Sequence, residues 1–337
     1  MNTNVLRKSL AVGIILLFVG ISIVPTIAQD IEKPSLPTSS GIWLYVGGSG
    51  PGNYTRIQDA INDSSDGDAV YVYNGTYNEF NITIDKSIFL FGEDKYSTII
   101  DANLSGNCID IFADNVTVRG FTIRNADFPN GTGIVIYSHN TTICDNIITD
   151  NDWWGIYIRG SNNNNISYNI ISNNGWAGIF GRCSNQMIVG NKIVNNKIGI
   201  LLYFGSFSVI KYNNISGQSG LGIQIDWVTN SSIVQNNFIK NKRDAVFSRS
   251  LIGELRVKLS NEFLYKKFYK EIYDPYYTPW KKNIWDGNYW GTPKILPQPI
   301  FGSFRILGRL STFNDIPIPI DCANFDWHPA QEPYDIP

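Results

Sequence analysis

The chain has 337 residues, of which 43% are hydrophobic and 13% aromatic, and this apolar content excludes an intrinsically disordered protein. Its net charge is −2 and only 17% of its residues are charged, so it has no strong field to attract nucleic acid, and we expect no nucleic-acid partner. Abundant Gly, Asn, Ile and Tyr favour an all-β protein.

Residues 1–28 have the pattern of a secretory signal peptide. Basic residues precede an apolar run from Leu10 to Val24, and Thr26-Ile27-Ala28 offers a small-residue cleavage site. The alternative is an uncleaved membrane anchor, because the stretch from Ala11 to Ala28 comes close to the roughly 18–20 residues that span a bilayer. Both alternatives place the rest of the chain outside the cytoplasm, after a Pro- and Ser-rich linker at residues 29–41.

Residues 42–68 are expected to form an N-terminal cap on the strands that begin near residue 69. In "YTRIQDAIND", Ile57, Ala60 and Ile61 recur at helical spacing. Such a short amphipathic helix can cover the open end of a stack of strands, where bare strand edges would otherwise invite aggregation.

Residues 69–250 are predicted to repeat, and the repeat is clearest after Gly133, where three registers share a period of about 22 residues. The first register is a Gly-Ile pair, which begins at Gly133, Gly155, Gly178, Gly199 and Gly222. The second is an Asn-x-apolar triplet, which begins at Asn146, Asn169, Asn191, Asn213 and Asn236. The third is an isoleucine three residues before each of these asparagines, at Ile143, Ile166, Ile188, Ile210 and Ile233.

Each repeat contains three short β-branched runs separated by Gly, Asn, Ser or Asp, which favours strands over helices. We therefore predict an all-β, single-stranded solenoid with three strands per rung, a parallel β-helix. Inward isoleucine columns would form its core. The asparagines would occupy the turns, because Asn tolerates left-handed conformations and because stacked amides can bond to one another in a ladder.

Residues 251–337 depart from the repeat. Apolar residues at four-residue spacing predict a helix over about Glu254–Tyr273, and the stretch "DIPIPID" predicts a segment that resists regular sheet pairing. Between them lies an aromatic cluster, either a C-terminal cap that seals the last rung or a platform for sugars: Trp280, Trp285, Tyr289 and Trp290.

These motifs together resemble a known family. "YTRIQDAIND", "GDAVYVYNGTYNE" and the Ile, Lys, Leu and Gly-Glu spacing after them, followed by Asn and Gly-Ile rungs, are similar to the NosD-like branch of right-handed parallel β-helix proteins. "NIWDGNYWG" and "FDWHPAQEPYDIP" resemble the ending of exported archaeal members. The resemblance, over residues 42–337, implies a right-handed β-helix within a superfamily of carbohydrate-binding proteins and sugar hydrolases. It implies little about activity, because one fold hosts many functions.

Rung alignment predicts a ligand-binding face. The second and fourth residues after each repeat glycine should point outward, and two tryptophans precede two of these glycines. Exposed aromatics can stack on sugar rings and arginines can pair with acidic sugars. The candidate ligand-binding residues are Trp153, Tyr157, Arg159, Trp176, Phe180, Arg182, Tyr203 and Asp226. The alternative is that a loop or the C-terminal segment covers this face and makes it a second core.

An enzyme with this fold would need acid and base groups, and the weak catalytic candidates are Asp150, Asp152 and Arg159. The simpler interpretation is that the two aspartates accept backbone bonds in turns. We expect no metal and no cofactor, because His139 and His328 lie far apart. The thiol or disulfide state of the four cysteines is left open: Cys108, Cys144, Cys183 and Cys322.

The leading functional prediction is an exported or cell-surface protein that binds a polysaccharide or surface glycan without catalysis. The alternatives are a lyase or hydrolase of acidic glycans and a purely structural surface protein; a membrane is a partner only if the N-terminal segment stays uncleaved. The chain also carries eleven Asn-x-Ser/Thr sequons, of which those buried in ladders could not carry a glycan.

Overall fold

The computed structural model describes residues 41–127, 131–250, 283–291, 298–308, 316–326 and 329–336, with side chains omitted at 248–250, 298–308 and 316–326. The expected signal peptide or anchor, almost all of the linker and the expected helix over Glu254–Tyr273 lie outside these residues.

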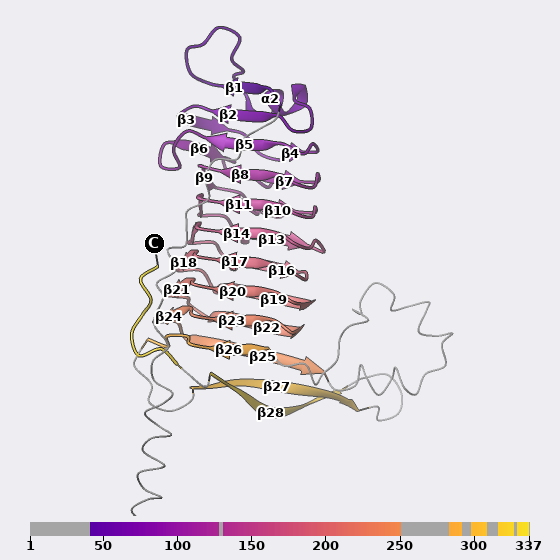
Figure 1. The fold of residues 1–337 in the computed structure, drawn as a ribbon, viewed down its shortest axis with the longest axis vertical. Helices are drawn as coiled ribbons and strands as arrows, with labels where there is room; N and C mark the ends of the chain where they lie inside the picture. Colours follow the sequence, from indigo (N-terminus) through magenta and orange to yellow (C-terminus); the bar gives the residue numbers. More distant parts are fainter. Residues whose placement is uncertain are drawn as a thin grey trace, which may run out of the picture. The chain divides into compact units, whose positions relative to one another are not determined.

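The described chain forms a right-handed parallel β-helix, as predicted, with three sheets that run along the stack of rungs (Figure 1). The first sheet, sheet A, consists of β1 (Trp43–Val46), β2 (Ala69–Val72), β5 (Phe89–Gly92), β8 (Thr117–Arg119), β11 (Thr142–Cys144), β14 (Asn165–Ser167), β17 (Met187–Val189), β20 (Val209–Lys211), β23 (Ser232–Val234) and β26 (Ile284–Asp286). Sheet B consists of β3 (Gly75–Asn78), β6 (Thr98–Asp101), β9 (Thr122–Arg124), β12 (Ile147–Thr149), β15 (Ile170–Ser172), β18 (Lys192–Val194), β21 (Asn214–Ser216) and β24 (Asn237–Ile239). Sheet C consists of β4 (Ile82–Ile84), β7 (Ile109–Ile111), β10 (Ile134–Ile136), β13 (Trp154–Arg159), β16 (Ala177–Arg182), β19 (Ile198–Ser206), β22 (Leu221–Thr229), β25 (Arg243–Ser250), β27 (Gln298–Gly308) and β28 (Ile316–Asp326).

The pairing register reproduces the periodicity of the sequence. Ile156 of β13 pairs with Ile134 and Ile179 on its two sides, and Ile166 of β14 pairs with Ile143 and Ile188. All of these isoleucines are fully buried. Because parallel strands repeat at about 4.8 Å, equivalent residues stack directly and the isoleucine columns form one continuous core.

The repeat glycines lie at or just before the start of the strands of sheet C, next to the corner where the chain arrives from sheet B. A Cβ atom at Gly155 would sit 2.7 Å from the Gly178 carbonyl oxygen and 2.8 Å from the Ile171 side chain. Gly133 and Gly178 meet the same obstacles one rung away. The Gly-Ile register therefore reflects a corner that has no room for a side chain.

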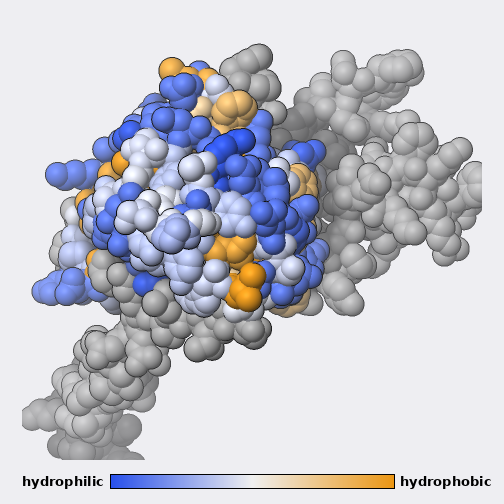
Figure 2. All heavy atoms as spheres, turned by 90° about the horizontal axis from the view of Figure 1, so that it is seen from above, coloured by the Kyte–Doolittle hydropathy of each residue, from blue (hydrophilic) through white to orange (hydrophobic). Residues whose placement is uncertain are grey.

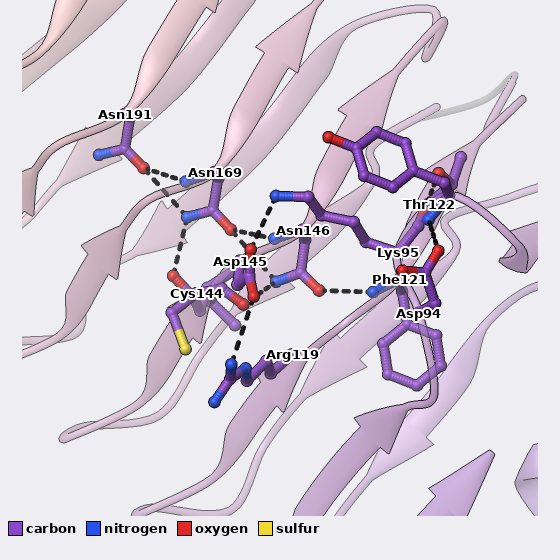
Figure 3. A network of polar contacts seen from close by, with 12 residues as sticks. Asp94, Lys95, Arg119, Phe121, Thr122, Cys144, Asp145, Asn146, Asn169 and Asn191 are labelled. Carbon is purple, nitrogen blue, oxygen red and sulfur yellow. Dashed lines mark hydrogen bonds and ion pairs between the residues drawn. The ribbon is translucent and has the colours of Figure 1, made fainter. Parts of the chain in front are cut away.

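Buried amides line the corners of the rungs. Asn191, between β17 and β18, accepts hydrogen bonds at Oδ1 from the backbone N–H of Asn169 (3.0 Å) and from its Nδ2 (3.0 Å), and donates from its own Nδ2 to the Ile166 carbonyl (2.8 Å). Figure 3 shows this ladder from Asn146 through Asn169 to Asn191. The corner between sheets B and C repeats this pattern with Asn151, Asn174, Asn196, Gln218 and Asn241. The corner between sheets C and A mixes amides with hydroxyls in two runs, Thr141–Asn164 and Gln186–Ser208–Ser231–Asn283, which are separated at the buried Gln186 Oε1, an atom with no hydrogen-bond partner among the described residues.

The left-handed conformation falls one residue before each ladder position. Tyr168 has φ 57° and Asn173 has φ 55°, whereas the ladder residues that follow them, Asn169 and Asn174, do not have positive φ. The two roles expected of the turn asparagines are therefore divided between neighbouring positions. The first residue of each pair bends the chain, and the second, which is buried, bonds to the next rung.

The N-terminal end is closed by α2 (Ile57–Asp63), which buries Ile57, Ala60 and Ile61 as the sequence predicted. The buried carboxylate of Glu79 accepts bonds from the first two helical N–H groups, at Ile57 (2.7 Å) and Gln58 (3.1 Å). Seen from above, the molecule presents mainly hydrophilic residues with small separate hydrophobic patches (Figure 2). In the described ranges no helix is long and apolar enough to cross a membrane.

The C-terminal segments extend the stack. Trp285 and Trp290 are 3% and 6% exposed and join the main core, where Trp290 stacks on Phe238 at 4.7 Å, so these two aromatics seal the last rung.

The expectation that "DIPIPID" resists sheet pairing is wrong: β28 pairs antiparallel with β27 along its whole length. β28 is the outermost strand of sheet C, and the nitrogens of Pro317 and Pro319, two residues apart, point to the same edge, where no bond is required.

Replacement of a ladder amide should destabilise the fold far more than replacement of a neighbouring exposed residue. We expect Asn191→Ala to lower the free energy of unfolding by about 2–4 kcal/mol, because it strips the buried Asn169 N–H of its acceptor. Urea unfolding followed by tryptophan fluorescence measures this. The control is Lys192→Ala, an exposed change one residue later, which should stay within about 0.5 kcal/mol; equal losses in both variants would contradict the role of the ladder.

Candidate functional site

The outward face of sheet C broadens along the stack. Its strands lengthen from three residues in β10 to six in β13 and β16 and nine in β19 and β22. Across these strands the register stacks Tyr157, Phe180, Leu201 and Gln224 in one column and Arg159, Arg182, Tyr203 and Asp226 in the next. Six of the eight residues proposed from the sequence therefore share one face.

A row of aromatic rings in contact runs along this face. Trp154 lies 4.7 Å from Tyr157 and stacks on Phe180 at 5.0 Å, and Phe180 lies 5.9 Å from Tyr203, between ring centroids. The row continues through Tyr203 and Phe204 to Trp227, with centroid distances of 6.2 Å and 4.8 Å. We call Trp153, Trp154, Tyr157, Phe180, Tyr203, Phe204 and Trp227 the aromatic row; it spans four consecutive strands.

Part of the row is buried although it points away from the core. Phe180 is only 8% exposed and Leu201 5%, and with Ala177 and Ile198 they form a second hydrophobic cluster. Trp154 and Tyr157 pack on this cluster. The expectation that Phe180 is an exposed binding side chain is therefore wrong: it supports the exposed rings around it.

Trp153 and Trp176 lie at the border of the face, 46% and 42% exposed. They occupy equivalent places on neighbouring rungs, because the residues that follow them, Trp154 and Ala177, are paired. Trp153 packs edge-on against Trp154 at 5.1 Å, whereas Trp176 has the Lys197 ammonium 3.9 Å from its ring centroid. Trp153 therefore belongs to the group of aromatic rings, whereas Trp176 is paired with a cation.

The opposite border carries charge. Arg159 and Arg182 are paired on neighbouring rungs and exposed. Arg159 lies over the Tyr137 ring, 5.4 Å from its centroid, and its Nη1 is 3.5 Å from the Tyr137 hydroxyl. Arg182 makes no ion pair with any residue that the structure describes. Two guanidinium groups about one rung apart therefore face outward.

The three predicted carboxylates do not form an accessible catalytic or binding group. Asp226 is 8% exposed and accepts a hydrogen bond from Gln224 Nε2 at 2.7 Å. Asp150 and Asp152 are exposed just before β13, whereas Arg159 ends that strand. A six-residue strand spans roughly 16–20 Å, so the structure does not bring the weak catalytic candidates together. Asp150 has φ 56° and accepts a bond from Thr149 Oγ1, as a turn residue would.

Asp110 is a candidate that the sequence patterns did not single out. It pairs with Val135 and so extends the Tyr157–Phe180 column by two rungs. Burial raises its pKa, although a hydrogen bond from Asn107 Nδ2 to its Oδ1 (2.9 Å) works in the opposite direction. The Gly-Ile pairs begin only at Gly133, so the signal that could have found Asp110 is the register of the less regular earlier rungs.

A second aromatic surface covers the first rungs of sheet A. Tyr45 stacks on Tyr73 at 6.1 Å, and Trp43 lies 6.4 Å from Tyr71 and 6.0 Å from Phe91. Trp43 and Tyr45 are 41% and 40% exposed. The alternation in "WLYV", "AVYVY" and "FLF" carries this signal.

Other reactive groups are structural. Asp145 binds Lys95 Nζ at 2.7 Å and Arg119 Nη2 at 3.4 Å, which ties together three rungs (Figure 3). Cys108, Cys144 and Cys183 are buried, and burial raises the pKa of Cys183 to about 12. The side chain of Cys322 lies outside the described residues. No group of three His, Cys, Asp or Glu side chains within the described ranges could hold a metal ion.

Comparison with known proteins agrees with the fold. A family model described as the right handed beta helix region matches residues 132–257. No curated protein sequence matches the chain. Among solved structures, the chain is similar to pectate lyase Pel9A, with 14% identity and a TM-score of 0.51 over 63% of this chain and 69% of that one. It is also similar to the complex of XylC with xylose, with 14% identity and a TM-score of 0.52 over 78% of this chain and 68% of that one. At this level of identity, the similarity concerns the fold alone.

The pKa shift of Asp110 predicts an unusual stability change. Because its folded pKa is raised, ionisation of Asp110 opposes folding, and this penalty is absent below the unfolded pKa of about 3.9 and complete above the folded pKa. Asp110→Asn should therefore stabilise the protein at pH 7, and the gain should vanish as the pH falls towards about 4. Urea unfolding at several pH values measures it.

Asp101→Asn provides the matched control with the opposite sign. Burial alone would raise the pKa of Asp101, but hydrogen bonds from Asn125, from the Asn103 N–H and from Arg124 outweigh it and lower the pKa. That stabilisation is complete above about pH 3.9 and is lost as the pH falls through the folded pKa, so Asp101→Asn should destabilise at pH 7. Destabilisation by both substitutions would refute the assignment for Asp110.

Proposed function

We propose that this chain is an exported cell-surface or envelope protein that binds glycans along the outward face of sheet C and does not transform them. Membership of the NosD-like branch and the location outside the cytoplasm are parts of this proposal. A purely structural role without a ligand is the alternative that a failed binding experiment would favour.

The aromatic row is the observation that supports the proposal. Its rings lie 4.7–6.2 Å apart across β13, β16, β19 and β22. Aromatic side chains combine a large apolar face with, in Tyr and Trp, a polar group, which suits the apolar C–H faces and hydroxyls of a sugar. A row that repeats with the rungs fits a chain of repeated units better than one small molecule.

The charged border favours an acidic glycan. Arg159 and Arg182 face outward on neighbouring rungs, and like charges placed side by side weaken a sheet unless an anion lies between or above them. Guanidinium groups bind carboxylates with two parallel hydrogen bonds, so uronic acids or sulfated sugars match this border.

Catalysis is the second candidate, supported by the raised pKa of Asp110 on the same sheet, since a carboxyl group that holds its proton can act as an acid. Glycoside hydrolysis needs two carboxylates about 5–9.5 Å apart. Asp110 and Asp226, the carboxylates that lie within strands in the two outward columns of sheet C, are separated by five strand spacings, or roughly 24 Å. The arrangement therefore favours binding. The fold that the chain shares with a pectate lyase and with a xylose-bound protein is compatible with both candidates.

The binding proposal predicts that exposed indoles contribute affinity. In affinity electrophoresis and calorimetry against neutral and acidic polysaccharides, the double variant Trp153→Ala/Trp176→Ala should bind about tenfold more weakly, since loss of about 1.4 kcal/mol is a factor of ten. The control is Met187→Ala, which removes a 48% exposed apolar side chain from sheet A in the same rung as Arg182. If the wild-type protein binds no polysaccharide, or if the double variant binds as well as the control, the proposal fails.

A second arm tests the preference for acidic glycans and the enzyme alternative. Arg182→Gln should weaken binding of acidic polysaccharides, and reduce its salt dependence, while binding of neutral ones stays unchanged. Equal weakening for both classes would remove the acidic preference. Release of new reducing ends or unsaturated products by the wild-type protein would replace the binding proposal with the enzyme alternative.

A further inference from the structure

The eleven sequons of the chain are separated by the structure into distinct groups. In the sequence they are equivalent acceptors for N-linked glycans, because each has the Asn-x-Ser/Thr pattern. Asn130 lies outside the described residues, which leaves ten to compare. A usable acceptor needs a side-chain amide that reaches solvent and is not already part of the fold.

Three sequon asparagines have a buried amide atom. Oδ1 of Asn165 and Asn214 and Nδ2 of Asn230 are shielded from solvent. Asn165 lies within β14, and the hydroxyl-bearing residue of its sequon, Ser167, is 3% exposed. In Asn230 the buried atom is the nitrogen that would carry the glycan, and in Asn165 and Asn214 it is the amide oxygen beside that nitrogen, so each amide is packed on at least one side.

Four other sequon amides are held by hydrogen bonds. Asn53 donates from Nδ2 to the Gly47 carbonyl at 2.6 Å. Asn62, Asn74 and Asn81 accept bonds at Oδ1 from, respectively, Gln58 Nε2 (2.8 Å), Ser97 Oγ (2.9 Å) and the Asn107 N–H (2.9 Å). These bonds fix the orientation of the amide; in Asn53 the bonded atom is the nitrogen that would carry the glycan, and in the other three it is the amide oxygen.

Asn103, Asn115 and Asn140 differ from all of these. Each is exposed, has positive φ (50°, 61° and 56°) and makes no side-chain hydrogen bond to any described residue. Asn103 follows β6 and is next to Leu104, which is 68% exposed. Asn115 and Asn140 lie on neighbouring rungs at the corner between sheets C and A, where their N–H groups bond to the next rung at His139 and Asn162. The left-handed turn directs these amides outward, away from the ladder residue that follows.

We propose that the chain is N-glycosylated at Asn103 and at one or both of Asn115 and Asn140, and not at Asn165, Asn214 or Asn230. The donor is an oligosaccharide linked through phosphate to a polyprenyl lipid, and a transferase of the export route joins the two. Nδ2 of the asparagine forms a bond to the anomeric carbon of the first sugar. The bond from that carbon to the phosphate oxygen breaks, the lipid phosphate leaves with the electron pair, and the amide gives up one proton to a base.

The inference rests on the export that is part of the proposed function, and it is compatible with the proposed binding face. All three asparagines lie at corners of the rungs and not within the strands that carry the aromatic row. Asn115 and Asn140 are about 4.8 Å apart along the stack, so two glycans there would be in contact, which is why occupancy of one suffices.

The test uses the full chain, produced in a host whose secretory route attaches N-linked glycans and recovered after export. Mass spectrometry of proteolytic peptides gives the occupancy of each sequon. We expect glycan on Asn103 and on Asn115 or Asn140 in most molecules, and none on the three asparagines with a buried amide atom. Asn103→Gln should remove the mass of one glycan from the intact protein, whereas the control Asn165→Gln should remove none.

Two results would overturn the inference. One is an exported chain without glycan at all three corner asparagines; the other is occupancy at Asn165, Asn214 or Asn230 equal to that at Asn103. A chain that is never exported would overturn the location and this inference together. Loss of polysaccharide binding in a correctly glycosylated chain would instead contradict the proposed function alone.

Discussion

The structure depends on a hydrogen bond between the buried amide of one rung and the backbone of the rung before it. At each corner the chain leaves one sheet before it joins the next, so its N–H groups there have no strand partner. Asn191 and its equivalents accept those N–H groups and donate to a carbonyl of the preceding rung. A buried N–H without a partner costs about 1–3 kcal/mol, and the cost would recur at each corner that a ladder residue now serves.

Regular outward columns are a consequence of this constraint. When three ladders hold the corners in place, each rung lies directly above the last, and the outward residues of sheet C stack as strictly as the inward isoleucines. A row of aromatic rings and a pair of arginines can then form without any loop to position them. Sheet C also lengthens to nine residues in β19 and β22, which widens the face where the row lies.

Much of the fold was predictable from the sequence, because its determinants are local and repeated. A glycine where a Cβ has no room, an isoleucine in each core column and an asparagine at each ladder position between sheets A and B all recur at the same spacing. The candidate face on sheet C was less predictable than the fold.

The spacing of the sequence places Tyr157 and Phe180 in one column, but only the packing of Trp154 and Ala177 beside them shows that Phe180 is buried. Likewise Asp152 and Arg159 are close in sequence, yet an intervening strand holds them at opposite ends. The β28 strand was missed for a related reason: prolines are excluded from a sheet interior but not from its edge, and strand order is not a local property.

The rung, its three corners and its core could be derived from the amino-acid sequence alone, because each follows from the volume, branching and hydrogen-bonding groups of individual side chains. Which side chains with the same local pattern are accessible depends instead on the tertiary structure. Asn140 and Asn165 have equivalent sequons, but Asn140 projects from a left-handed corner and Asn165 has a buried amide oxygen within a strand. Accessibility is set by the rungs above and below, whose residues are a full repeat away in the chain, beyond the reach of any motif.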